Sequence, residues 1–151
     1  MERDNSTTKR FLAEAAIGPG MRVLEIGCGG GEVTQVLAEL VGPAGTVVAV
    51  DRSDKALATA QDRMKEHGIE QVQLLTADVS GDLSILNAFE QGSFDVLTGR
   101  RVLMYLPEPA AVVRQLARWV KGDGLVVFEE TDLSMVPARQ TPMPAHDQAI
   151  A

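Results

Sequence analysis

The sequence predicts an α/β fold with a doubly wound, mostly parallel β-sheet. Short runs that are apolar on both faces alternate with segments of helical periodicity, which is typical of a parallel sheet covered by helices. Acidic residues and glycines follow these runs, at the end of each strand where such sheets bind ligands. The expected strands are residues 22–26, 46–50, 72–76, 94–98 and 125–128, and the expected helices are residues 6–16, 32–41, 54–67, 82–90 and 109–119.

Capping residues and glycines mark the helix ends in the first half of the chain. Ser6 or Thr7 can cap the first helix, and the Gly-Pro-Gly sequence at 18–20 is expected to stop it. A glycine turn leads into the second helix, whose apolar residues recur on one face. Ser53 can cap the third helix, which Gly68 ends.

The second half of the chain repeats this alternation. The strand at 72–76 closes on an Ala-Asp pair, and residues 82–90 are expected to be helical before the strand at 94–98. Pro109 suits the first turn of the last helix. The Gly-Asp-Gly sequence at 122–124 is expected to turn the chain into the fifth strand.

One domain is expected, covering residues 1–132 and including the N-terminal helix. Residues 133–151 read as an irregular, proline-containing tail, which we expect to be truncated. The fifth strand would then have an open edge, which is a site for pairing with a second copy of the chain. A homodimer through this edge is therefore a prediction.

The overall composition restricts the class of partner and the location. A net charge of -7 argues against nucleic acid, whose binding proteins usually present a basic face. No apolar run approaches the roughly 20 residues that span a bilayer, and the N-terminus lacks an apolar signal segment. The single cysteine, Cys28, suits a reducing compartment, and no cluster of metal ligands is present. We therefore expect a cytoplasmic protein without a bound metal and without a nucleic-acid or membrane partner.

The glycine turn after the first strand has the pattern acid-x-Gly-x-Gly-x-Gly, starting at Glu25. The dinucleotide-binding pattern G-x-G-x-x-G fails, because the sixth residue counted from Gly27 is Glu32. An acid inside a buried strand needs a positive or hydrogen-bonding partner. A ligand ammonium group would be such a partner, whereas a pyrophosphate would be repelled.

Residues 23–31 resemble motif I of the class I, Rossmann-like S-adenosylmethionine-dependent methyltransferases. This resemblance implies that Asp51, closing the second strand, holds the ribose hydroxyls and that Asp78, closing the third, meets the adenine amino group. Arg100 or Arg101 could hold a carboxylate of the cofactor or of the substrate. The positions assigned to S-adenosyl-L-methionine are Glu25, Gly27, Cys28, Gly29, Gly31, Asp51, Arg52, Asp78, Val79 and Arg100.

Two later segments extend the resemblance over roughly residues 10–132. The resemblance implies further strands after the fifth, and we expect this chain to lack these C-terminal strands of the full methyltransferase fold. Residues 94–97 and 102–107 are similar to the fourth-strand motif of this family. Residues 119–124 (Trp-Val-Lys-Gly-Asp-Gly) are similar to its W-x-K-P-G-G motif, with Gly122 in place of the proline and Asp123 in place of a glycine.

Several of these residues also have simpler interpretations. Asp51 could cap a helix, Asp78 could belong to a loop, and Cys28 is expected to be a small neutral residue whose backbone touches the cofactor. Arg100 and Arg101 could form structural ion pairs. The acids after the fifth strand, Glu129, Glu130 and Asp132, could orient or deprotonate an acceptor or serve structure alone. No catalytic residue is assigned.

The favoured function is in-line methyl transfer from S-adenosyl-L-methionine to a small-molecule acceptor. The alternative is a cofactor-binding fragment, or a partner-binding remnant of a methyltransferase, with little or no turnover. A dehydrogenase domain that binds NAD is a third and weaker interpretation.

Overall fold

The computed structural model describes residues 4–131 of the chain. The elements in order are α1 (Ser6–Glu14), β1 (Arg22–Ile26), α2 (Glu32–Val41), β2 (Thr46–Asp51), α3 (Asp54–Glu66), β3 (Val72–Thr76), η1 (Ser84–Ala88), β4 (Phe94–Arg100), η2 (Leu103–Tyr105), α4 (Pro109–Leu116), η3 (Ala117–Trp119) and β5 (Val120–Glu129). The three η elements are 3₁₀ turns. The predicted tail at 133–151 lies outside the described residues.

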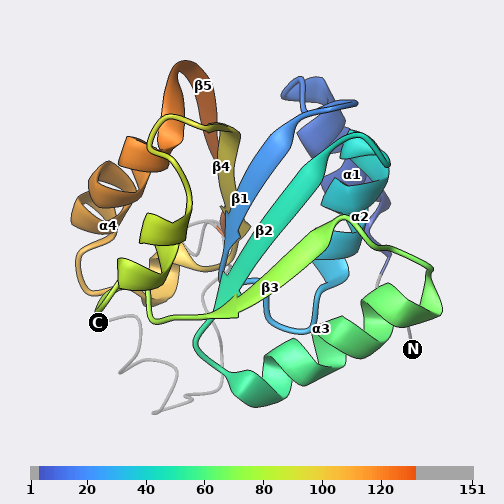
Figure 1. Ribbon diagram of the computed structural model, residues 1–151, viewed down its shortest axis with the longest axis horizontal. Helices are drawn as coiled ribbons and strands as arrows, with labels where there is room; N and C mark the ends of the chain where they lie inside the picture. Colours follow the sequence, from blue (N-terminus) through green and yellow to red (C-terminus); the bar gives the residue numbers. More distant parts are fainter. Residues whose placement is uncertain (1–3, 132–151) are drawn as a thin grey trace, which may run out of the picture.

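The five strands form one sheet in the order β3-β2-β1-β4-β5, and every neighbouring pair is parallel. The chain first winds outward from β1 to β2 and β3, and then returns to place β4 on the other side of β1 (Figure 1). This order confirms the doubly wound prediction. Strand order therefore reverses between β1 and β4, which is where sheets of this type open a crevice for a ligand.

Helices cover both faces of the sheet, so that the core has two layers (Figure 1). On one face α1, α2 and α3 contribute Leu12, Leu37 and Leu57 to a cluster that includes Val23 of β1. On the opposite face the side chains come from η1, α4 and η3; they include Leu86, Leu116 and Trp119 and pack on Leu24, Val48 and Leu97. Adjacent strand residues face opposite layers, which is why these strands are apolar throughout.

The structure differs from the predicted helices at three places. The first helix begins after Asn5, which is its N-cap in place of Ser6 or Thr7, and it ends at Glu14 because Ala16 takes a left-handed conformation (φ 72°). Residues 82–90 form only the 3₁₀ turn η1. The last helix gives way to 3₁₀ geometry at 117–119.

The prediction that residues 122–124 form a turn before the fifth strand is also wrong in part, because the strand begins earlier. These residues lie inside β5, opposite a register irregularity between Phe94 and Val96 of β4. The irregular stretch is fastened by Lys121, whose Nζ donates to Oδ1 of Asp95 (2.8 Å). Pairing with β4 therefore extends the strand back to Val120.

The outer edge of β5 has no strand beside it within residues 4–131, and Val126 on this strand is 44% exposed. Pairing of two copies through this edge stays a prediction.

Among the described helices, none has the length and apolar character needed to cross a membrane.

Candidate functional site

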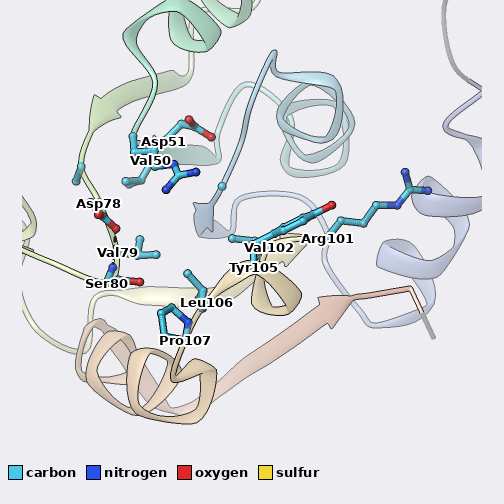
Figure 2. Close-up of a pocket in the computed structure, with 13 residues that line it drawn as sticks. Val50, Asp51, Asp78, Val79, Ser80, Arg101, Val102, Tyr105, Leu106 and Pro107 are labelled. Atoms are coloured by element: carbon cyan, nitrogen blue, oxygen red, sulfur yellow. Dashed lines mark hydrogen bonds between the residues drawn. The ribbon is translucent and has the colours of Figure 1, made fainter. Parts of the chain in front are cut away.

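A cavity of about 410 Å³ opens at the carboxyl edge of the sheet, beside the point where strand order reverses. Its walls come from segments that follow four different strands. Figure 2 shows Asp51 and Asp78 on one side of this larger cavity, with Val102 and Tyr105 across from them. The lining residues are Gly27, Val50, Asp51, Arg52, Ala77, Asp78, Val79, Ser80, Arg101, Val102, Tyr105, Leu106 and Pro107.

A smaller cavity of about 210 Å³ lies on the other side of the glycine turn. Gly27, just after β1, lines both this cavity and the larger one. Its lining is Glu25, Gly27, Cys28, Gly29, Gly30, Glu32, Val33 and Arg100. An elongated ligand with one end in each cavity would cross the turn at Gly27.

Close packing at the glycine turn excludes side chains at Gly27 and Gly31. Gly27 has φ 66°, and a Cβ atom there would lie 2.6 Å from Cγ2 of Val102. Gly31 has φ 86°, and its Cβ atom would lie 2.9 Å from Cβ of Ala60 on α3. Both positions therefore need glycine for conformation and for space. Gly31 lines neither cavity; its role is to let α2 start against α3.

Asp51 joins the end of β2 to the glycine turn. Its Oδ2 accepts a hydrogen bond from the Gly29 N–H (2.9 Å), and its Oδ1 accepts from the Ser53 N–H (2.9 Å). The cap of α3 is Ser53, whose hydroxyl accepts from the Ala56 N–H (3.1 Å). Asp51 therefore does not cap the helix itself. It fixes the turn and still presents carboxylate oxygens to the larger cavity.

Glu25 is a buried carboxyl group that faces the smaller cavity. It is 1% exposed, and its Oε2 accepts from the Thr34 hydroxyl of α2 (2.6 Å). Burial raises the pKa of Glu25 to about 7, against the opposing effects of the Thr34 hydrogen bond and the Arg100 charge. Thr34 is the only hydrogen-bond donor to Glu25 among residues 4–131, so the carboxyl group keeps acceptor capacity for a ligand.

Asp78 and Val79 follow β3 and form the wall opposite the loop after β4 (Figure 2). Asp78 is exposed, and its Oδ1 accepts from the Ser80 N–H (2.9 Å), which also makes it a loop-stabilising residue. Val79 is 8% exposed and packs into the core below the cavity. A carboxylate above an apolar floor suits a flat polar ring. Arg52, on the Asp51 side, is exposed.

Arg100 lines the smaller cavity, but its guanidinium is held by the chain. Nη1 donates to Asn5 Oδ1 and to Thr8 Oγ1 (3.0 Å each), and Nη2 pairs with Oε2 of Glu32 (3.3 Å). Its side chain is 15% exposed. Arg100 therefore ties α1 to the start of α2 across the end of β4. The sequence could not reveal this arrangement, because Asn5 and Arg100 are 95 residues apart.

The Cys28 thiol is a poor nucleophile in this setting. The side chain is 7% exposed, and burial together with the nearby Glu25 and Asp51 carboxylates raises the pKa of the thiol. Its N–H donates to the Val50 carbonyl oxygen (3.1 Å), linking the turn to β2. These contacts agree with the expectation of a small neutral residue.

The residues present fit S-adenosylmethionine better than a dinucleotide. Two carboxyl groups, Glu25 and Asp51, flank the glycine turn on either side, and a pyrophosphate at this turn would meet both. A cofactor with an ammonium group and a sulfonium finds opposite charge there instead. A Cβ atom at Gly29 would meet no atom of the chain within 4 Å, so the open side of the turn is free for a ligand.

Comparison with known proteins agrees with this chemistry. A sequence profile described as "Methyltransferase domain" matches residues 17–149. The chain belongs to the class I S-adenosylmethionine-dependent methyltransferases. S-adenosylmethionine is the cofactor of this family.

Two curated relatives of this methyltransferase chain show how much of a longer protein it matches. It is 38% identical over 125 residues to a ubiquinone biosynthesis O-methyltransferase of Thiobacillus denitrificans, covering 82% of this chain and 50% of the relative. It is 33% identical over 118 residues to a demethylmenaquinone methyltransferase of Lactococcus lactis, covering 78% and 45%. The chain therefore spans about half the length of these relatives.

A solved structure confirms the fold of the methyltransferase. A SAM-dependent methyltransferase from Aquifex aeolicus superimposes with a TM-score of 0.75 at 21% sequence identity. The match covers 92% of this chain and 70% of the other. At this identity the likeness establishes architecture rather than substrate.

The acids at the end of β5 and just after it have structural partners that sequence analysis missed. The Glu129 carboxylate accepts from the Thr8 hydroxyl (2.9 Å to Oε2), and Oε1 of Glu130 accepts from the N–H groups of Val102 (3.3 Å) and Leu103 (3.0 Å). They fasten α1 and the loop after β4. Asp132 lies outside the described residues.

Proposed function

We propose that the two cavities beside Gly27 together bind S-adenosylmethionine and that this methyltransferase transfers its methyl group to a small-molecule acceptor. The observation that carries the proposal is the position of Glu25, a 1% exposed acidic residue in the lining of the smaller cavity. An ionised carboxylate in such a place is costly without a partner of opposite charge. The cofactor's ammonium group would supply that partner.

The remaining contacts follow from where the strands end. Asp51 would accept from the ribose hydroxyls, since its oxygens line the larger cavity and are already oriented by Gly29 and Ser53. Asp78 would meet the adenine amino group above Val79. In this arrangement the glycine turn, the part of the site with the least side-chain bulk, lies between the two ends of the cofactor.

Methyl transfer requires mainly that the reacting atoms be aligned. When bound, S-adenosylmethionine supplies a methyl group on a positively charged sulfur that needs little further activation. The chain's own task is to hold both reactants, and alignment can contribute about 7–11 kcal/mol. We assign no general base among the described residues, since Glu129 and Glu130 are engaged in structural contacts.

The class of acceptor is inferred from charge and from the relatives. The net charge of -7 does not favour nucleic acid. The relatives described above are named for quinone-type small molecules and are named as methyltransferases. Their names favour an enzyme over a binding remnant without turnover.

Calorimetric titration with S-adenosylhomocysteine and with NAD tests the cofactor assignment. S-adenosylhomocysteine should bind and NAD should not. Asp51→Asn should weaken binding of S-adenosylhomocysteine by roughly 1.5–3 kcal/mol, about 10–150-fold, because the ligand loses hydrogen bonds to a charged group. Asp62→Asn, an exposed change on α3, is the matched control and should have no effect. Tight binding of NAD without S-adenosylhomocysteine would overturn the proposal.

A further inference from the structure

The loop after β4 holds Arg101 in a strained backbone conformation at the rim of the larger cavity. Its φ is 53°, a left-handed value that costs a non-glycine residue roughly 1–2 kcal/mol. The other described non-glycine residue with positive φ, Ala16, follows a helix end, where this conformation is ordinary. Arg101 ends no helix. Strain of this kind persists where the surroundings enforce it, and it concentrates at functional positions.

Two acids of β5 and the segment after it enforce this conformation. The Arg101 N–H donates to the carbonyl oxygen of Glu129 (2.8 Å). The next two N–H groups, those of Val102 and Leu103, donate to the Glu130 carboxylate at 3.3 and 3.0 Å. The backbone on both sides of the Arg101 side chain is therefore held by hydrogen bonds, so the point from which the side chain extends is set by the fold.

The guanidinium of Arg101 has no protein partner in the described part of the chain. It is exposed and makes neither an ion pair nor a side-chain hydrogen bond with residues 4–131. Its neighbour Arg100 is instead neutralised by Glu32. In a chain of net charge -7, an unpaired cation at a cavity rim is available for an anion from outside.

An exposed aromatic ring lines the same cavity as this cation. Tyr105, in the 3₁₀ turn after Arg101, lines the same cavity and is 74% exposed. Figure 2 shows the Arg101 side chain extending away from Asp51 and Asp78, with the Tyr105 hydroxyl turned to the same side. An anion at this end therefore lies away from the carboxylates of the opposite wall, and Tyr105 offers a flat surface for stacking.

We propose that Arg101 and Tyr105 recognise the methyl acceptor, and that the acceptor is an aromatic molecule carrying a carboxylate. The ring stacks on Tyr105 and the carboxylate pairs with Arg101 at the rim. This inference rests on the proposed function, because it takes the remainder of the cavity to be occupied by the cofactor.

The test compares an acid with a neutral molecule of the same skeleton. The protein, saturated with S-adenosylhomocysteine, is titrated with 3-phenylpropionate and with 3-phenylpropanol by ligand-observed NMR. The acid should bind about fivefold more tightly, the upper range for an exposed charge pair. Arg101→Gly, which also relieves the backbone strain, should abolish this preference, and Arg101→Lys should retain it. Tyr105→Ala should lower the affinities for both probes by the same factor.

Two further cations serve as matched controls. Arg52→Gln removes the other arginine side chain that lines the larger cavity, and Arg114→Gln removes an exposed charge of α4 that lines neither cavity. Both should leave the ratio of the two affinities unchanged. Three results would overturn the inference. They are loss of the preference for the acid in Arg52→Gln, equal binding of the two probes to the wild type, and no saturable binding of the acid.

The affinity for S-adenosylhomocysteine separates this inference from the proposed function. It is measured first, and it should be the same in the wild type and in Arg101→Gly. A loss in Arg101→Gly would place Arg101 at the cofactor and overturn the inference. Failure of the wild type to bind S-adenosylhomocysteine would count against the proposed function. Normal cofactor binding with equal binding of the probes would count against the inference alone.

Discussion

At the scale of a single residue, burial of Glu25 lowers the stability of the free protein when the carboxyl group is ionised, and we propose that the same ionised group binds the ligand. Its pKa is raised to about 7 by burial from an ordinary 4.5. The native state therefore holds this proton more tightly than the unfolded chain does. The resulting stabilisation is fully present below about pH 4.5 and is lost as the pH rises through about 7, where the buried group ionises.

Glu25→Gln should therefore stabilise the free protein at pH 8 and have little effect at pH 5. The difference between 4.5 and about 7 corresponds to about 3 kcal/mol, at 1.36 kcal/mol for each pH unit. The amide introduced by this substitution would keep an oxygen for the Thr34 hydroxyl. Urea unfolding at the two pH values measures the change, with Glu66→Gln as the exposed control. Equal effects of Glu25→Gln at pH 5 and pH 8 would contradict the argument.

Local sequence is enough to single out candidate site residues whose signal lies in their own segment. Glu25 was singled out by its spacing from the glycine turn, and Asp51 by its place at the end of the second strand together with the family resemblance. The structural partners of Glu129 and Arg100 left no such signal. Thr8 and Glu129 are 121 residues apart, and only the folded sheet brings them together. The strained Arg101 was equally hidden, because its conformation is imposed by β5.

Strands and helices were predicted well where one element determines its own ends. The bounds 22–26, 32–41 and 72–76 are confirmed, since apolar periodicity and glycines define them locally. The fifth strand was predicted too short because pairing with β4 extends it back to Val120. Residues 82–90 were predicted as a longer helix, but only Ser84–Ala88 form a 3₁₀ turn, in which Leu86 is buried.

The N-terminal helix α1 is held to the sheet by polar contacts around Thr8. This side chain is 4% exposed; its hydroxyl accepts from Arg100 (3.0 Å) and donates to Glu129. Thr8→Val should cost about 1–3 kcal/mol, because two charged groups lose a buried partner. Hydrogen exchange should accelerate in Ser6–Glu14 while β1 to β3 remain protected.

Thr59→Val on the exposed face of α3 provides the comparison for Thr8→Val. Its hydroxyl only donates to the Lys55 carbonyl oxygen of its own helix (3.4 Å). This variant should leave exchange in α1 unchanged. Uniform acceleration over the whole chain in Thr8→Val would show that the contacts stabilise the fold in general rather than α1.

The junction of α2 and α3 depends on the absence of a side chain at Gly31. Gly31→Ala should destabilise the protein through both its φ of 86° and the 2.9 Å approach to Ala60. Gly20→Ala separates the two effects, because Gly20 has φ 80° but a methyl group there would meet no atom within 4 Å. We expect roughly 1 kcal/mol for Gly20→Ala and about 1–3 kcal/mol more for Gly31→Ala. Equal losses in urea unfolding would show that contact with α3 is unimportant.

At the scale of the whole molecule, the cavities collect residues from the ends of β1, β2, β3 and β4. A ligand in them bridges segments that are distant in sequence and joined only through the sheet. Its binding free energy therefore adds to the stability of the entire domain rather than to one loop. Thermal unfolding thus reports occupancy of the site without requiring turnover.

S-adenosylhomocysteine at 100 times its dissociation constant should stabilise the protein by about 2.7 kcal/mol. For a chain of 151 residues this corresponds to a rise in Tm of roughly 5–10 °C. The rise measured at one fixed concentration should be larger at pH 8 than at pH 5.5, since Glu25, with its pKa of about 7, is ionised only at the higher pH. The amino group of S-adenosylhomocysteine stays protonated at both pH values. Glu25→Gln should remove this pH dependence, and an identical rise at both pH values in the wild type would show that the ammonium group does not lie against Glu25.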